Sequence, residues 1–141
     1  MTVIDAPAPA RPVLAVTALQ LTEPLPGFPD HRDYALVPAD GHGLVRWLQA
    51  VDPDGPRFLV VPATTYFPDY APALPRAVRA ELGLDEGVQP DLYCIVTVPD
   101  GDVTAATANL RAPLAVSAAG GRARQVVLPD GNHPIRRPLR R

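Results

Sequence analysis

The sequence predicts a mainly β protein: a single-domain, small antiparallel β-barrel or sandwich with one short helix. The first observation is the proline content, 19 of 141 residues, which is more than twice the average of about 5%. Because a proline inside a helix costs about 3 kcal/mol, long helices are not expected. The second observation is a series of roughly six to eight short β-compatible runs separated by hairpin-sized turns. The third is that strands and helices do not alternate, which excludes the βαβ units of a parallel sheet and its usual nucleotide site.

The first part of the chain supplies a tail and several strands. Residues 1–11 are rich in alanine and proline and have no periodic pattern, so we expect a flexible N-terminal tail followed by one domain over residues 12–141. Segment 44–51 is ambiguous, because Leu44, Trp47, Leu48 and Val51 fit a helical stripe although eight residues make a short helix. The runs predicted as strands are 12–21, 34–38, 57–61 and 91–98.

The best helix candidate is Pro75–Leu82. Pro75 suits the first helical position, where the missing N–H needs no partner. Leu74, Val78 and Leu82 recur every four residues, and Gly83 suits the C-terminal cap. The sequence therefore predicts one short amphipathic helix.

The stretch from Val103 to Leu128 contains three more β-compatible runs, at 103–110, 113–118 and 122–128. Gly120-Gly121 separates the last two and predicts a hairpin turn, because glycine adopts positive φ at little steric cost. The segment after it, 135–141, is expected to form a tail that docks across a sheet edge.

A rigid corner is predicted between the first two of these runs, at residues 109–113. Pro113 pushes Ala112 to an extended conformation and cannot donate a ladder hydrogen bond, so it begins a strand or lies on an edge. Asn109 is suited to fixing the turn, while Leu110 and Arg111 place an apolar side chain and a permanent charge beside it. Two interpretations stay open: a structural strand connection, or a contact site presented to a partner.

Charge is distributed unevenly along the chain, whose net charge is −2. Residues 1–110 hold 6 Arg and 14 acidic residues, a balance of −8, whereas residues 111–141 hold 7 Arg and one Asp, a balance of +6. An acidic surface from residues 30–102 would suit a basic partner. The basic tail has no aromatic side chain for base stacking, so direct nucleic-acid binding is not expected.

Compartment signals point to the cytoplasm by default. No apolar run approaches the ~20 residues that a membrane span needs, and the N-terminus lacks the pattern of a signal peptide. Cys94 is the one cysteine, which excludes an internal disulfide or a multi-cysteine metal site. It lies in an apolar run, so we expect a buried, unreactive thiol.

No motif predicts catalysis, a metal site or a cofactor. His31, His42 and His133 lie in separate turns, at spacings that match no helix-borne metal pair. Phosphate-binding glycine loops and nucleophile elbows are missing from the sequence. Asp69 lies in an aromatic segment and is expected to be buried; a structural hydrogen bond, a contact surface and a general acid are all open roles for it.

A series of short motifs runs through most of the chain in a fixed order. The most specific is TANLRAPL at 107–114. The others are PGFP at 26–29, DYAL at 33–36, WLQ at 47–49, FLVV at 58–61, FPDY at 67–70, IVTV at 95–98 and RQVVL at 124–128. In this order they resemble the FliW flagellar assembly factor family, over roughly residues 12–139.

The resemblance implies a small β-barrel-like fold and a non-enzymatic cytoplasmic protein that uses no cofactor. It also implies two protein partners. Flagellin is held before export, and the translational regulator CsrA is antagonised so that flagellin mRNA can be translated. A switch of this kind needs only that the two partners cannot occupy the protein at the same time.

Candidate partner-binding residues follow from the need for apolar anchors with a charged rim. Core packing is the expected role for Trp47, Phe58 and Phe67. Arg111→Ala and Leu110→Asp are predicted to weaken a partner without unfolding the protein. The candidate site residues are Asn109, Leu110, Arg111, Ala112, Pro113, Phe28, Asp69 and Tyr70.

Three alternatives to this function stay open. One is a flagellin-specific chaperone that does not bind CsrA. The second is a small-molecule binder or enzyme built on a β-barrel, which would need a deep pocket with convergent titratable groups. The third is a direct RNA binder using the arginine-rich tail, whose affinity would fall steeply with salt.

Overall fold

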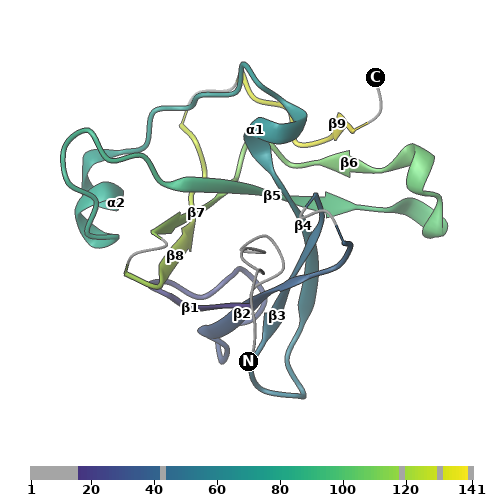
Figure 1. Ribbon diagram of the computed structural model, residues 1–141, viewed down its shortest axis with the longest axis horizontal. Coiled ribbons are helices and arrows are strands. Elements are labelled where there is room, and N and C mark those ends of the chain that lie inside the picture. The colour runs from purple at the N-terminus through teal and green to yellow at the C-terminus, as the bar shows by residue number, and fades with distance from the viewer. Residues whose placement is uncertain (1–15, 42–43, 118–119, 130–131, 140–141) are drawn as a thin grey trace, which may run out of the picture.

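Nine strands form one continuous hydrogen-bonded sheet in the part of the chain that the computed structural model describes, residues 16–41, 44–117, 120–129 and 132–139 (Figure 1). Their order is β4-β3-β2-β1-β8-β7-β5-β6-β9, and β4 also pairs with β5. Seven of the nine strands therefore close into a barrel, and β6 and β9 extend it. The strands are β1 (Thr17–Leu21), β2 (Asp33–Pro38), β3 (Arg46–Ala50), β4 (Arg57–Pro62), β5 (Asp91–Thr97), β6 (Thr107–Ala108), β7 (Leu114–Ser117), β8 (Arg122–Gln125) and β9 (Arg137–Pro138).

The predicted β-barrel is confirmed, with one difference in strand direction. All pairings between the described strands are antiparallel except β1–β8, which is parallel and holds only the pairs Gln20–Arg122 and Leu21–Ala123. This short contact closes the gap between the first hairpins and the β7–β8 hairpin. The barrel is therefore mixed rather than purely antiparallel.

The described residues contain two short α-helices, α1 (Ala63–Tyr66) and α2 (Arg76–Glu81). The second is the helix predicted at Pro75–Leu82, although Pro75 lies at its N-cap rather than at its first helical position, and Gly83 follows it at φ +72. The first was not predicted, because a single turn of four residues shows no periodicity. It is closed by a hydrogen bond of 2.8 Å from the Phe67 N–H to the Ala63 carbonyl, and Ala63 is fully buried.

The ambiguous segment 44–51 is a strand, β3. Leu48 and Ala50 point into the barrel and are buried, whereas Trp47 and Gln49 lie on the outside. Buried and outward-facing side chains therefore alternate with the two-residue period of a strand, rather than the 3.6-residue period of a helix. Trp47 is half-buried and covered by the Arg57 guanidinium, 4.3 Å from its ring centre, so its predicted core position is wrong. Phe58 is also half-buried.

The predicted strand 103–110 is mostly not a strand. Residues Pro99–Gly101 and Val103–Ala105 form 3₁₀ turns, and only the two residues of β6 pair in the sheet. The Asp102 carboxylate accepts hydrogen bonds from the N–H of Thr104, at 3.0 Å, and from its hydroxyl, at 2.6 Å. This local capping competes with a ladder and turns the chain. Residues 1–15 and Ala118, which include the predicted tail and part of two predicted strands, lie outside the described residues.

Two hydrophobic clusters hold the molecule together. One fills the barrel interior and includes Tyr34, Leu48 and Val60. The other lies on the outer face of β4, β5 and β7, beneath the helices and the C-terminal segment. Val60 and Val61 are both buried because they serve opposite faces. Cys94 belongs to the second cluster, and burial raises the pKa of its thiol to about 12, in agreement with the predicted unreactive thiol.

A polar network fastens α2 to the strands beneath it. The Glu81 carboxylate accepts a hydrogen bond of 2.8 Å from the Thr22 hydroxyl and pairs with the Arg124 guanidinium at 2.8 Å. Arg124 also pairs with Glu23 at 3.0 Å. The network lies where β1 and β8 make their short parallel contact, which these side chains reinforce.

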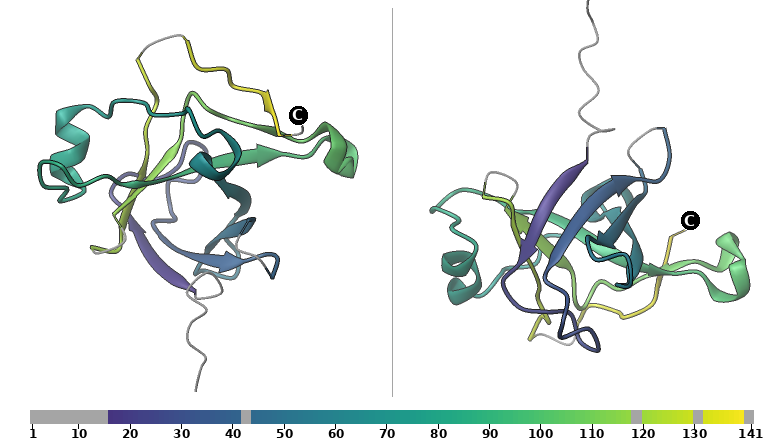
Figure 2. Two further views of the ribbon diagram at one scale, coloured as in Figure 1. Left: turned by 45° about the horizontal axis from the view of Figure 1, so that its top comes forward. Right: turned by 90° about the horizontal axis from the view of Figure 1, so that it is seen from below.

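The C-terminal arm, which we define as residues 132–139, runs along the outer side of β6 (Figure 2). Its strand β9 pairs with β6 through Thr107–Pro138 and Ala108–Arg137. The predicted docking of the tail on a sheet edge is thus confirmed for these residues.

Candidate partner-binding groove

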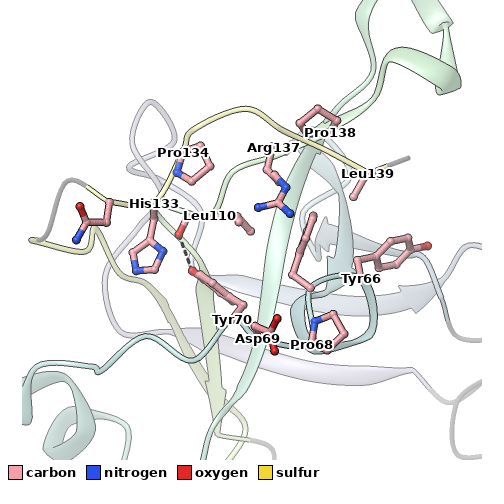
Figure 3. Close-up of a pocket in the computed structure, with 12 residues that line it drawn as sticks. Tyr66, Pro68, Asp69, Tyr70, Leu110, His133, Pro134, Arg137, Pro138 and Leu139 are labelled. Atoms are coloured by element: carbon pink, nitrogen blue, oxygen red, sulfur yellow. Dashed lines mark hydrogen bonds between the residues drawn. The ribbon is translucent and has the colours of Figure 1, made fainter. Parts of the chain in front are cut away.

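A groove of about 630 Å³ lies between the C-terminal arm and the segment that follows α1 (Figure 3). One wall is the turn at residues 66–70, the other is the arm, and Leu110 lies at the base. Its lining is mixed, with three aromatic rings beside one carboxylate and one guanidinium. The lining residues are Tyr66, Phe67, Pro68, Asp69, Tyr70, Leu110, Asn132, His133, Pro134, Arg137, Pro138 and Leu139.

Tyr70 joins the two walls of the groove. Its hydroxyl donates a hydrogen bond of 2.5 Å to the Leu110 carbonyl, and its ring meets the His133 ring edge-on at 5.3 Å (Figure 3). The side chain is buried, and this burial, followed by the nearby Cys94, raises the pKa of Tyr70 well above its ordinary value. Tyr70 is therefore a bridge within the protein rather than the exposed ring expected of a contact anchor.

The corner at residues 109–113 is built by Asn109. Its side-chain carbonyl accepts hydrogen bonds from the N–H groups of Arg111, at 3.0 Å, and Ala112, at 3.1 Å. This is the turn-fixing role suggested for Asn109. Leu110 and Ala112 are only 3% and 8% exposed, and Pro113 is fully buried. The expectation that these three residues present apolar area to a partner is therefore wrong for the unbound chain, because all three are buried and Leu110 packs in the outer cluster.

Arg111 is half-buried and holds the arm in place. Its Nε donates a hydrogen bond of 3.2 Å to the His133 carbonyl, and the neighbouring Leu110 N–H donates one of 3.0 Å to the Pro134 carbonyl. The corner therefore contributes to the groove from behind, by positioning the arm.

Asp69 is exposed at the rim of the groove, not buried as predicted. The reason is local: the Tyr70 N–H bonds to the Phe67 carbonyl at 2.9 Å, and the tight turn sends Tyr70 inward and Asp69 outward. Facing it, Arg137 extends from the arm and places its guanidinium 5.2 Å from the Phe67 ring centre. Arg137 and His133 were not predicted, because only the fold brings the arm to this turn.

Phe28 does not line the groove. Its ring packs edge-on against Phe58 at 5.5 Å, next to the barrel interior cluster. A separate hollow of about 380 Å³ lies beside Phe58, and Asn109 borders it. The structure thus brings Asp69, Tyr70 and Leu110 together at one groove, with Asn109 and Arg111 behind it and Phe28 elsewhere.

Residues 16–41, 44–117, 120–129 and 132–139 contain no group of three His, Cys, Asp or Glu side chains able to hold a metal ion. Among them, no helix has the length and apolarity required to cross a bilayer.

Comparison with known proteins decides the family. A family model described as FliW protein matches residues 12–139. The chain belongs to the FliW family. It is 36% identical over 114 residues to the flagellar assembly factor FliW of Symbiobacterium thermophilum, covering 80% of this chain and 82% of that protein. It is also 36% identical over 121 residues to the Bdellovibrio bacteriovorus protein of the same name, covering 86% of this chain and 69% of that one.

The FliW fold is shared as well. The chain superposes on a crystal structure of the flagellar assembly factor FliW with a TM-score of 0.78, at 25% identity, over 86% of this chain and 84% of that one. The resemblance drawn from the ordered motifs is therefore confirmed. FliW proteins are assembly factors and not enzymes, so this chain is a non-enzymatic member of its family.

Proposed function

We propose that this FliW protein is a cytoplasmic flagellar assembly factor that binds flagellin and antagonises the translational regulator CsrA, coupling flagellin synthesis to flagellum assembly. The observation that carries the proposal is the 36% identity with a flagellar assembly factor over about four-fifths of both chains. The shared barrel, with a TM-score of 0.78, supports the same conclusion at the level of the fold.

The groove is the surface we assign to partner binding. Contact energy in protein interfaces is concentrated in Tyr, Trp and Arg side chains with a polar rim. The groove supplies Tyr66 and Arg137, and the exposed Asp69 carboxylate lies at its rim. The coupling needs no chemical reaction. Flagellin that has not yet been exported occupies the FliW protein, and export of flagellin leaves the FliW protein available to bind CsrA.

A pull-down with both partners tests the proposal. Tagged protein is mixed with recombinant flagellin and CsrA from the same genome, first separately and then together. Retention of each partner, with loss of CsrA when flagellin is added, is the expected result. Retention of flagellin alone would replace the proposal with the chaperone-only function. No retention of either partner at micromolar concentration would overturn it.

A matched pair of variants tests the groove. Asp69→Ala removes the rim carboxylate, whereas Asp54→Ala removes an exposed carboxylate in the distant β3–β4 turn. An exposed charge pair contributes about 0.2–1 kcal/mol, so Asp69→Ala should change affinity by roughly 1.4- to fivefold and act mainly on the association rate. Equal effects of the two variants would remove the groove from the proposal.

A further inference from the structure

The C-terminal arm covers a sheet edge with few backbone contacts. The Leu110 N–H donates to the Pro134 carbonyl at 3.0 Å, and the Leu139 N–H donates to the Ala106 carbonyl at 3.1 Å. Between them the ladder holds only two residue pairs, because β9 is two residues long. If the arm lifts, the Leu110 N–H and the Ala106 carbonyl lose their partners, and a strand edge becomes available.

The arm forms a short, exposed strand at this edge. Pro134 and the two residues of β9 are exposed. Pro138 stands opposite Thr107 at a pair without ladder hydrogen bonds, because the bond beside it runs from the Leu139 N–H to the Ala106 carbonyl. The missing N–H of Pro138 therefore costs the arm no bond to β6.

Side chains of the arm show what the groove accepts. His133 meets the Tyr70 ring, the Arg137 guanidinium covers the Phe67 ring, and Leu139 packs against the outer core cluster. The groove left beside them still measures about 630 Å³, so the arm does not fill it.

Charge at the groove favours a basic occupant. The exposed Asp69 carboxylate has no ion-pair partner among the described residues. It lies on the wall opposite Arg137 (Figure 3). A cation on an incoming segment gains both this carboxylate and the face of the Phe67 ring.

We propose that the C-terminal arm is a displaceable strand that forms one wall of a peptide-binding groove, and that an extended basic and apolar segment of a partner protein replaces it at the edge of β6. The segment adds antiparallel to β6, as strand addition at an exposed edge generally does. It places a cation over Phe67 and an apolar side chain where Leu139 packs. Because the arm must lift before the segment can bind, the free energy needed to lift the arm lowers the affinity for the partner.

This inference goes beyond the proposed function, because it names a segment chemistry and a competing element rather than a partner. The proposed function and this inference can be refuted independently of each other. Pull-down of flagellin or CsrA through another face would leave the proposed function intact and the groove empty, whereas peptide binding at the groove does not depend on either protein.

A labelled peptide with the arm sequence Asn-His-Pro-Ile-Arg-Arg-Pro-Leu provides the probe, and the full chain is the receptor. The receptor is used as wild type, as the double variant Arg137→Ala/Leu139→Ala, which weakens the arm, and as the control variant Arg136→Ala, which changes an exposed neighbouring arginine. Fluorescence anisotropy measures the affinity, and thermal melting confirms that each barrel is folded.

The double variant should bind the peptide at least tenfold more tightly than the wild type, whereas Arg136→Ala should match the wild type. Equal binding to wild type and double variant, equal binding of a scrambled peptide, or no binding to the double variant would each overturn the proposal.

Hydrogen exchange on the wild type gives an independent measurement. The Leu110 and Leu139 amides, which the arm protects, should exchange at least a hundredfold faster than the Cys94 amide in β5. Exchange of all three amides at the rate of global unfolding would show that the arm does not lift, and would overturn the proposal.

Discussion

Removing one oxygen atom at Tyr70 tests how the groove is held together. Tyr70→Phe keeps the ring that packs against His133 and removes the hydroxyl that donates to the Leu110 carbonyl at 2.5 Å. Leu110 is 3% exposed, so its carbonyl cannot exchange this bond for water without local opening. The variant therefore leaves a buried acceptor without its donor.

The expected loss follows from the cost of an unsatisfied buried polar group, about 1–3 kcal/mol. For a domain of this size, 1 kcal/mol corresponds to roughly 3–5 °C in the midpoint of thermal unfolding. Tyr70→Phe should therefore lower the melting temperature by roughly 3–15 °C. Differential scanning calorimetry or circular dichroism at neutral pH measures the shift.

Two other tyrosines provide matched controls. Tyr34 is fully buried, and its hydroxyl has no hydrogen-bond partner in the described part of the chain. Tyr34→Phe should leave stability unchanged or raise it, because it removes a desolvated hydroxyl without breaking a bond. Tyr66→Phe, at the half-buried rim of the groove, should change stability by no more than about 0.5 kcal/mol. If Tyr70→Phe melts within 1–2 °C of wild type, or no lower than Tyr34→Phe, the bridge from Tyr70 to Leu110 does not hold the groove.

Three further predictions concern the corner and the network beneath α2. Asn109→Ala removes the acceptor for two backbone N–H groups and should cost about 1–3 kcal/mol in chemical denaturation, whereas Asn109→Asp retains the acceptor and should cost less. Leu110→Asp should lower the melting temperature strongly or abolish folding, because it buries a charge; a folded variant that only loses partner binding would restore the original contact-site interpretation. Hydrogen bonds from Arg124 and Thr22 hold the pKa of Glu81 below its ordinary value of 4.5, so stability from this group is complete above pH 4.5 and is lost as pH falls through the lowered pKa. Glu81→Gln should flatten part of this acid loss in melting curves recorded from pH 6 down to pH 3, and an unchanged curve would remove Glu81 from the acid response.

Local patterns were sufficient for most of the barrel. Proline-marked corners, alternating strands and a glycine after α2 are signals within a few residues, and they located β2, β4, β5 and α2 to within one or two positions. The segment around Trp47 was undecided because its apolar residues fit both periods. Pairing with β2 and β4 settles it, since four of the five residues of β3 meet partners on both sides.

Long-range relations could not be obtained from the sequence. The parallel contact of β1 with β8 joins residues about 100 positions apart and contains only two pairs. The groove depends on a similar relation, because Arg137 and His133 come to Phe67 and Tyr70 only after the arm has docked. Asp69 was misplaced for a local reason: an acid among aromatic residues was expected to be buried, but a tight turn directs it outward.

The corner at residues 109–113 shows how a structural role and a functional role become linked. Its buried residues cannot contact a partner in the unbound chain, yet their backbone fixes both walls of the groove: Leu110 accepts from Tyr70 on one side and donates to Pro134 on the other. A substitution at the corner therefore changes the position of the arm and the stability of the outer core together. Loss of partner binding in such a variant identifies a contact residue only when melting is unchanged. By this criterion Asp69, which is exposed and belongs to no buried network, is the residue whose substitution reports on the groove itself.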